Sequence, residues 1–241
     1  MHTLLSNAFK ALEEIIQPKY CIFCMNKIPV KETGFICQDC KSKIEKNPPP
    51  FCNRCGRHTY NKLCRGCLSK DKRDHFKAYY LFQYRGLIQD GLQRFKYRRA
   101  LSLLNYLSEE LYLFLKEEIL PFEKIDFISY VPLHRRKLKE REFNQAELLA
   151  RAVSKRTNIT LLKKLLLRKI YTTSQSKLSK EERRVNIDGV FKVNLKYKNI
   201  IRNSKVLLID DIITTGSTTI ECIKELERLG SKTIVLAAAG G

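Results

Sequence analysis

The stretch from Lys205 to Thr219, KVLLIDDIITTGSTT, constrains the fold of this 241-residue chain more than any other. It begins with an unbroken apolar run, Val206 to Ile209, which is typical of a parallel strand covered on both faces. We expect this strand to stop at Asp210, where two adjacent acids, Asp210 and Asp211, follow the apolar run. Open α/β sheets bind ligands at the carboxyl ends of their strands. The stretch therefore predicts an α/β domain with a ligand site at this edge.

Small and hydroxyl-bearing residues follow the two acids. The loop consists of Thr214, Thr215, Gly216, Ser217 and Thr218. Such residues let successive backbone N–H groups converge on an anion. Thr218 followed by Glu221 fits a capping box, so we expect a helix there whose positive end favours phosphate. A strand, a turn and a capped helix also occur in proteins that bind nothing, but two adjacent carboxylates repel each other and suit a cation or a polyol.

This order of strand, acid pair and Thr-Thr-Gly-Ser-Thr loop resembles the phosphoribosyl pyrophosphate (PRPP) loop of the type I phosphoribosyltransferases. The resemblance implies that Asp210 and Asp211 are the catalytic acids, which receive the ribose hydroxyls and nearby Mg²⁺. It also implies that the loop from Thr214 to Thr218 holds the 5′-phosphate.

Eight of the nine cysteines form four C-x-x-C pairs. These are Cys21/Cys24, Cys37/Cys40, Cys52/Cys55 and Cys64/Cys67. Two sulfurs at this spacing can reach one tetrahedral metal, so the pairs predict two Cys₄ sites with Zn²⁺ as the leading candidate. Sequential pairing and an interleaved cross-brace both fit the spacing. Four thiolates leave no open coordination position, so we interpret both metals as structural.

Lys and Arg outnumber Asp and Glu by 46 to 25, which gives a formal net charge of +21. Polyanions are the natural partners of such a chain: nucleic acid, phosphorylated small molecules or an anionic membrane face. No window approaches the roughly 18 apolar residues that a membrane span needs, so no transmembrane segment is expected. Residues 1–17 have the pattern of an amphipathic helix and lack the features of a signal peptide. We therefore expect a cytoplasmic protein, with the inner face of the membrane as a place of association.

Length and composition together predict two domains. The first, residues 1–75, would hold the N-terminal helix and a double zinc ribbon. The second, residues 76–241, would be the α/β domain. Its early part predicts a strand over residues 76–84 and two helices after Gly86.

A second unit of strand, loop and helix is predicted around Pro132. DFISYV, from Asp126 to Val131, is the strand, and a helix should begin near Asn144. Between them we expect a basic loop, whose cations are His134, Arg135, Arg136, Lys137, Lys139 and Arg141. Guanidinium groups suit the paired oxygens of a pyrophosphate, and in phosphoribosyltransferases the corresponding loop receives that group. A solvent-facing basic loop without a ligand is the alternative.

Three further groups are candidates for contact with an acceptor or with DNA. They are Lys96, Arg98 and Arg99; Arg141, Asn144 and Gln145; and Gln175, Arg183 and Asn186. The first group lies among aromatic residues that could stack on a nucleobase. The last group lies in a long polar segment, which fits a lid or an acceptor-binding segment. The preceding segment, Leu161 to Tyr171, could be a strand or a helix.

Over nearly its full length, the chain resembles the ComF family of competence proteins. The motifs are the four C-x-x-C pairs, FKY, VPLHRRKLKEREFNQ, QSKLSKEERRVN and LLIDDIITTGST. The resemblance implies a type I phosphoribosyltransferase-like fold, with a doubly wound, mostly parallel sheet and an N-terminal double zinc ribbon. One departure is Glu142, where the family usually has glycine. Glutamate there removes conformational freedom and adds negative charge beside the expected pyrophosphate site.

The family resemblance also implies a function. It implies a protein that handles incoming single-stranded DNA in the cytoplasm during natural transformation, with competence helicase and recombination proteins as associates. Our first hypothesis is a module that binds PRPP with Mg²⁺ and also grips single-stranded DNA. The alternatives are a catalytically active phosphoribosyltransferase with an unknown nitrogen acceptor, and a zinc-ribbon adaptor whose phosphoribosyl site is vestigial.

Overall fold

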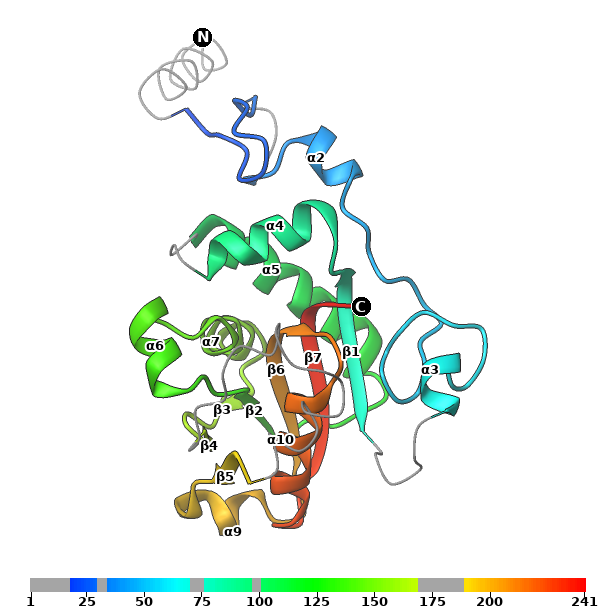
Figure 1. The fold of residues 1–241 in the computed structure, drawn as a ribbon, viewed down its shortest axis with the longest axis vertical. Coiled ribbons are helices and arrows are strands. Elements are labelled where there is room, and N and C mark those ends of the chain that lie inside the picture. The colour runs from blue at the N-terminus through cyan, green and yellow to red at the C-terminus, as the bar shows by residue number, and fades with distance from the viewer. Residues whose placement is uncertain (1–17, 30–33, 70–75, 97–100, 169–188) are drawn as a thin grey trace, which may run out of the picture.

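A five-stranded parallel sheet lies at the centre of the molecule, with the strand order β1-β7-β6-β2-β3 (Figure 1). The computed structural model describes residues 18–29, 34–69, 76–96, 101–168 and 189–241. The strands of the sheet are β1 (Lys77–Gln83), β2 (Phe127–Tyr130), β3 (Thr160–Leu161), β6 (Lys205–Ile213) and β7 (Lys232–Gly240). All four neighbouring pairs run parallel, which confirms the predicted sheet.

Helices cover both faces of this sheet. One face carries α4 (Gly86–Phe95), α5 (Leu101–Phe114) and α7 (Gln145–Thr157). The other carries α10 (Ser217–Glu227) and the antiparallel pair β4 (Leu166–Arg168) and β5 (Phe191–Val193). The short elements are α2 (Gln38–Ser42), α3 (Arg65–Leu68), the π-helix η1 (Leu115–Ile119), α6 (Arg135–Arg141), the 3₁₀ turn η3 (Leu195–Tyr197) and α9 (Lys198–Ile201). Among the described helices, none has the length and apolar character that crossing a bilayer demands.

The apolar run in β6 is buried on both sides, as its sequence predicts. Leu207 and Ile209 pack in the core beneath α5 and α7, whereas Val206 and Leu208 pack in the core beneath α10. All four side chains are fully buried. Each contributes roughly 1.5–3 kcal/mol of transfer free energy, so β6 anchors both layers.

The strand β6 is longer than predicted. We expected it to stop at Asp210, but it continues to Ile213 because its backbone stays paired with β7. Asp210 is in register with Ala237, and Ile213 with Gly240. The two acids therefore lie on a hydrogen-bonded strand, which fixes their backbone more firmly than a loop would.

Residues 45–47 protect the outer edge of β1. Asn47 N donates to Leu81 O at 2.7 Å, and Gln83 N donates to Glu45 O at 2.9 Å. An exposed edge strand invites unwanted pairing, and this segment covers it. The division into domains 1–75 and 76–241 stays a prediction, and the predicted helix over residues 1–17 lies outside the described residues.

Candidate functional site

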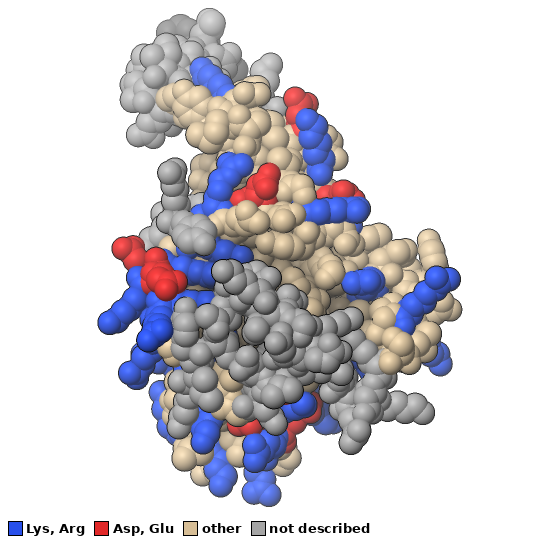
Figure 2. Space-filling model, in the orientation of Figure 1, with Lys and Arg blue, Asp and Glu red and all other residues tan. Residues whose placement is uncertain are grey.

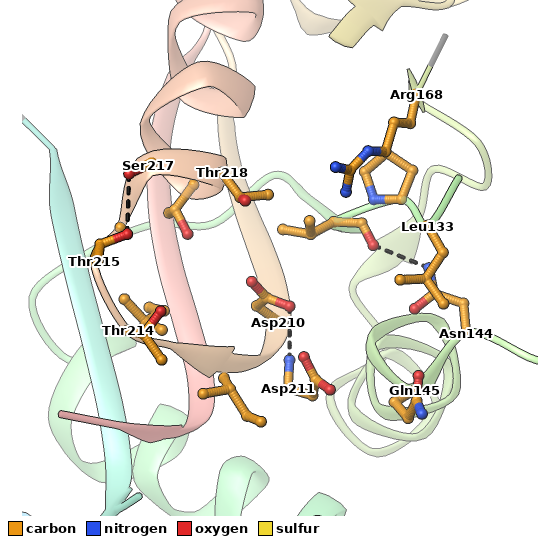
Figure 3. A pocket seen from close by; sticks show the side chains of 16 residues that line it. Leu133, Asn144, Gln145, Arg168, Asp210, Asp211, Thr214, Thr215, Ser217 and Thr218 are labelled. Carbon is orange, nitrogen blue, oxygen red and sulfur yellow. Dashed lines mark hydrogen bonds between the residues drawn. The ribbon is translucent and has the colours of Figure 1, made fainter. Parts of the chain in front are cut away.

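A cavity of about 150 Å³ lies at the carboxyl ends of β2 and β6 (Figure 3). Both strands end at the same edge of the sheet, where α/β proteins bind ligands. The lining residues are Val131, Pro132, Leu133, Asn144, Gln145, Arg168, Asp210, Asp211 and the run from Ile212 to Thr219. The structure thus brings together the acid pair and the small-residue loop that the sequence singled out.

The loop after β6 turns into α10 at Gly216. This residue has a φ of +77°, in the left-handed region that glycine adopts without strain. The predicted capping box of Thr218 and Glu221 is wrong, because the left-handed turn starts the helix at Ser217 and makes Gly216 its N-cap. Gly216 offers no side chain to cap the first-turn N–H groups, and anions are favoured partners of such groups. The Oγ atoms of Thr215 and Ser217 lie 3.0 Å apart beside them.

The two acids differ in environment. Asp210 is 8% exposed, whereas Asp211 is half-buried. The Asp211 N–H donates to Asp210 Oδ1 at 2.8 Å. Burial, followed by repulsion from Asp211, raises the pKa of Asp210 well above its usual range. The pair therefore holds a proton more tightly than two separate carboxylates would.

Arg168 lines the cavity, although our sequence analysis gave it no role. It comes from β4, and its guanidinium points toward the cavity in Figure 3. The same group lies 5.3 Å from the centre of the Phe191 ring. Burial lowers the pKa of Arg168, and the nearby Cys222 and Asp210 oppose that effect. An arginine inside the leucine-rich segment was the signal that could have identified it, because arginine is mostly exposed and seldom lies among apolar residues without a partner.

The basic segment before Asn144 is a helix, so the predicted loop is wrong. Residues of good helix propensity form α6, and the Arg136 N–H donates to Nδ1 of His134 at its start. His134, Arg135, Arg136 and Lys137 lie beside the cavity but do not line it. Figure 2 shows Lys and Arg side chains gathered on this face of the molecule.

Several cations repel one another next to the cavity. Burial, followed by repulsion from Arg168 and Arg141, lowers the pKa of Lys137, and Lys96 contributes to this repulsion. Lys96 and Arg141 are therefore close enough to act on the same group as Arg168. An anion with several charges would relieve this repulsion.

Asn144 and Gln145 line the cavity but are buried and hydrogen-bonded. Asn144 Nδ2 donates to Val131 O at 2.9 Å, while its Oδ1 accepts from the Ala146 N–H at 3.0 Å. It thus caps α7 and ties that helix to the end of β2. Gln145 Nε2 donates to Phe95 O at 3.5 Å. These bonds position the cavity wall. Arg98, Arg99, Gln175, Arg183 and Asn186, our other candidate contacts, lie outside the described residues.

The C-x-x-C pairs form two centres with sequential pairing. One contains Cys21, Cys24, Cys37 and Cys40, and the other contains Cys52, Cys55, Cys64 and Cys67. Within each centre, all four Sγ atoms lie within 4.8 Å of one another. Sulfurs at about 2.3 Å from a tetrahedral zinc are separated by roughly 3.8 Å. The distance of 3.6 Å between Sγ of Cys24 and Cys37, and between Sγ of Cys55 and Cys64, fits this geometry.

Backbone amides stabilise one thiolate in each centre. Although burial opposes the effect, hydrogen bonds from the backbone of Cys24 and Cys37 help to lower the pKa of Cys21 to about 6. The backbone of Cys55 and Cys64 acts in the same way on Cys52 and brings its pKa to about 7. Zinc binds the thiolate, so Cys21 and Cys52 favour the metal-binding form near neutral pH, whereas burial raises the pKa of Cys55 to about 11 and that of Cys40 to about 12.

The positive φ of Glu142 explains why glycine suits this position, where this chain departs from the family. This residue ends α6 in the left-handed region, with a φ of +64°. Replacing Glu142 by glycine should stabilise the protein by about 1 kcal/mol, because glycine adopts this conformation without strain. Glu140→Gly, inside the same helix, should instead destabilise by about 0.5–1 kcal/mol. Urea unfolding measures both, and equal losses in the two variants would contradict the strain at Glu142.

Comparison with known families agrees with both halves of this architecture. The family of double zinc ribbon domains matches residues 12–70, and the family of phosphoribosyl transferase domains matches residues 146–239. The fold and its centres thus define a phosphoribosyltransferase-like α/β protein with an N-terminal double zinc ribbon.

Curated relatives cover most of the chain. Competence protein F of Haemophilus influenzae is 30% identical over 218 residues, which are 89% of this chain and 93% of that protein. Competence protein ComFC of Bacillus subtilis is 26% identical, over 76% of this chain and 74% of its own length. DNA utilization protein YhgH of Escherichia coli K12 is 26% identical, over 90% of this chain and 94% of its own length. The chain belongs to the ComF family of competence proteins.

Proposed function

We propose that this protein binds PRPP together with Mg²⁺ and handles incoming single-stranded DNA in the cytoplasm during natural transformation. The observation that carries the PRPP part is one cavity that holds three complementary groups: the acid pair, the uncapped start of α10 and Arg168. A sugar phosphate that also carries a pyrophosphate needs acceptors for its hydroxyls and donors or cations for its phosphates. The cavity offers both.

Each part of PRPP has a proposed partner. The ribose hydroxyls would donate to Asp210 and Asp211, and the 5′-phosphate would accept from the N–H groups of the loop. Arg168 and the cations of α6 would neutralise the pyrophosphate. Mg²⁺ commonly binds one or two carboxylates together with substrate phosphates, and the half-buried Asp211 suits that chemistry.

Calorimetry with PRPP tests the proposal directly. We expect saturable heat with Mg²⁺ present and weaker binding after Mg²⁺ is removed by chelation. Ribose 5-phosphate, which lacks the pyrophosphate, should bind more weakly because it brings less negative charge to the cations beside the cavity. Absence of heat with PRPP at millimolar concentration would reject the proposal and favour the adaptor hypothesis.

The DNA part of the proposal is supported by the basic face around α6 and by relatives named for competence and DNA utilization. Arg135 and Lys139 are exposed there. We expect the double variant Arg135→Gln, Lys139→Gln to reduce the salt dependence of binding to single-stranded DNA. Each lost phosphate contact should change the slope of log K against log salt by about 0.7.

Fluorescence anisotropy with a labelled oligothymidylate at several salt concentrations measures this slope. Lys155→Gln, Arg156→Gln is the charge-matched control. Both residues are exposed in the last turn of α7, roughly 15 Å along the helix from its start beside the cavity. If the control variant weakens binding as much as the α6 variant, DNA contacts are spread over the surface rather than gathered at α6.

The second candidate function is catalytic transfer of the phosphoribosyl group to an unknown nitrogen acceptor. The position of Arg168 and Lys137 favours it, because partly buried cations beside the cavity would stabilise the charge on a departing pyrophosphate. Pyrophosphate release from PRPP with Mg²⁺ and a panel of amines and nucleobases tests it. Release no faster than from a protein with asparagine at positions 210 and 211 would exclude turnover with those acceptors.

Association with helicase and recombination proteins is part of the first proposal and can be tested by co-purification from competent cells.

A further inference from the structure

The second zinc centre lies directly behind the phosphate loop. A second cavity, of about 100 Å³, separates them. Its walls include Cys55, Cys64 and Cys67 on one side and the loop from Ile213 to Gly216 on the other. Thr214, Thr215 and Gly216 line both cavities. The loop therefore separates the candidate phosphate site from the cavity next to the second metal centre by a single layer of residues.

The second ribbon, residues 50–69, is attached firmly to the sheet that carries this loop. Ala78 N donates to Arg54 O at 2.9 Å. The buried Asn47 side chain donates to Gly56 O at 2.7 Å and to Tyr80 O at 3.1 Å. A Cβ atom built on Gly56 would lie 2.3 Å from Ala78 O, which shows how closely the two backbones approach. Movement of this ribbon would therefore be transmitted to β1.

Packing also joins β1 to the loop. Phe76, which precedes β1, lies 3.4 Å from a Cβ built on Gly216. Gly241, which lines the second cavity together with Phe76, donates its N–H to Ile213 O at 3.2 Å. The left-handed turn at Gly216 thus contacts the start of β1, and the strand just before it is tied to the end of the chain.

The first ribbon has a different location. Its described residues, 18–29 and 34–44, line neither cavity. It packs on α4 and α5 instead: a Cβ built on Gly91 of α4 would lie 2.7 Å from the Phe23 ring and 3.3 Å from Leu103 of α5, and all three regions share one core cluster. The two metal centres therefore have equivalent ligands but unequal relations to the phosphate site.

We propose that the metal of the second ribbon holds the phosphate loop in its anion-binding conformation, so that zinc occupancy at Cys52, Cys55, Cys64 and Cys67 and affinity for PRPP are coupled. The first centre lacks this coupling. A loop of small residues has many alternative conformations, and a ligand that must order it binds more weakly. Coupling between two sites is reciprocal, so PRPP must also retain the zinc. The inference rests on the proposed binding of PRPP at this loop.

Matched cysteine variants of the full chain test the coupling. Cys55→Ser and Cys24→Ser each remove the second sulfur of the first knuckle in their ribbon. We expect Cys55→Ser to weaken PRPP binding about tenfold or more in calorimetry, with Cys24→Ser within about twofold of the wild type. Zinc content by mass spectrometry and circular dichroism establish which centre is lost and whether the protein is folded.

Zinc release from the wild-type protein tests the coupling without any substitution and decides the matter if Cys55→Ser does not fold. A colorimetric chelator should remove the two zinc ions at different rates, and saturating PRPP should slow one of them about tenfold. In Cys24→Ser, the remaining zinc should be the protected one. If PRPP binds in calorimetry but protects neither zinc, or protects both equally, the coupling is wrong. If PRPP gives no heat, the proposed function fails as well.

Discussion

Asparagine at both Asp210 and Asp211 should weaken PRPP binding at least about 100-fold, yet the same protein should be more stable than the wild type at neutral pH. The weaker binding follows from the carboxylates that are lost. Bound Mg²⁺ would favour the ionised form of both acids, and a hydrogen bond to a charged group contributes about 1.5–3 kcal/mol. Calorimetry with PRPP and Mg²⁺ measures this loss.

The gain in stability follows from the burial of Asp210. Because its pKa is raised in the folded state, the folded protein keeps this proton at pH values where the unfolded chain has released it. Below about pH 4 both states are protonated and the carboxyl has no effect. As the pH rises from there toward the folded pKa, the wild type loses stability. Asparagine does not ionise, so the variant does not lose stability in this way. At pH values above the folded pKa of Asp210, the variant should be more stable than the wild type by on the order of 1 kcal/mol.

Urea unfolding of both proteins between pH 4 and pH 9 checks this prediction. The two stability curves should converge near pH 4 and separate as the pH rises. Asp90→Asn, at an exposed position of α4, is the control; it makes the same replacement once, outside the cavity, and should follow the wild type in both assays. A variant of the acid pair that binds PRPP normally, or that is less stable than the wild type at pH 8, would contradict the assignment of these acids to a ligand site.

Gly56→Ala should be among the most destabilising single substitutions in the second ribbon. The added Cβ would lie 2.3 Å from Ala78 O and 2.7 Å from Tyr79 Cα, both backbone atoms that cannot move aside as a side chain can. Gly56 also has a φ of +70°, which costs alanine about 1–2 kcal/mol even without a clash. We expect a total loss of about 3 kcal/mol or more, with the ribbon displaced from β1.

Gly66→Ala provides the control in the same ribbon. No atom lies within 4 Å of a Cβ at Gly66, and this residue is part of α3, so alanine should be neutral or stabilise by up to about 1 kcal/mol. Thermal unfolding followed by circular dichroism compares the two variants. Similar melting temperatures would mean that the contact between the second ribbon and β1 contributes little to the fold.

The parts of the structure that could be predicted from sequence depend on short spacings. The buried strand, the acid pair and the small-residue loop are contiguous, so their proximity in the fold required no knowledge of distant contacts. The same is true within each C-x-x-C knuckle, where three positions place both sulfurs on one metal. Sequential pairing of the knuckles was one of two arrangements that the spacing allowed, and the structure selects it.

The parts that could not be predicted depend on tertiary contacts. The strand β6 extends beyond its apolar run because β7 continues to pair with it. No residue near Asp210 indicates in the sequence that β7 is the partner. Arg168 reaches the cavity because β4 pairs with β5, more than 20 residues further along the chain. The start of α10 was misplaced for a different reason. The sequence allows either Gly216 or Thr218 as the N-cap of this helix, and the structure uses Gly216.

The pairing of β1 with β7 has a consequence for how the protein assembles. Lys77 is in register with Ile234, about 160 residues away, so the sheet closes only when its last strand arrives. Contacts so distant in sequence form slowly. Until then, the inner edge of β1 has no neighbour, whereas its outer edge already meets residues 45–47 and the second ribbon. Early metal loading would thus give the nascent strand one protected side during synthesis, and zinc starvation should appear first as aggregation of newly made protein rather than as unfolding of mature molecules.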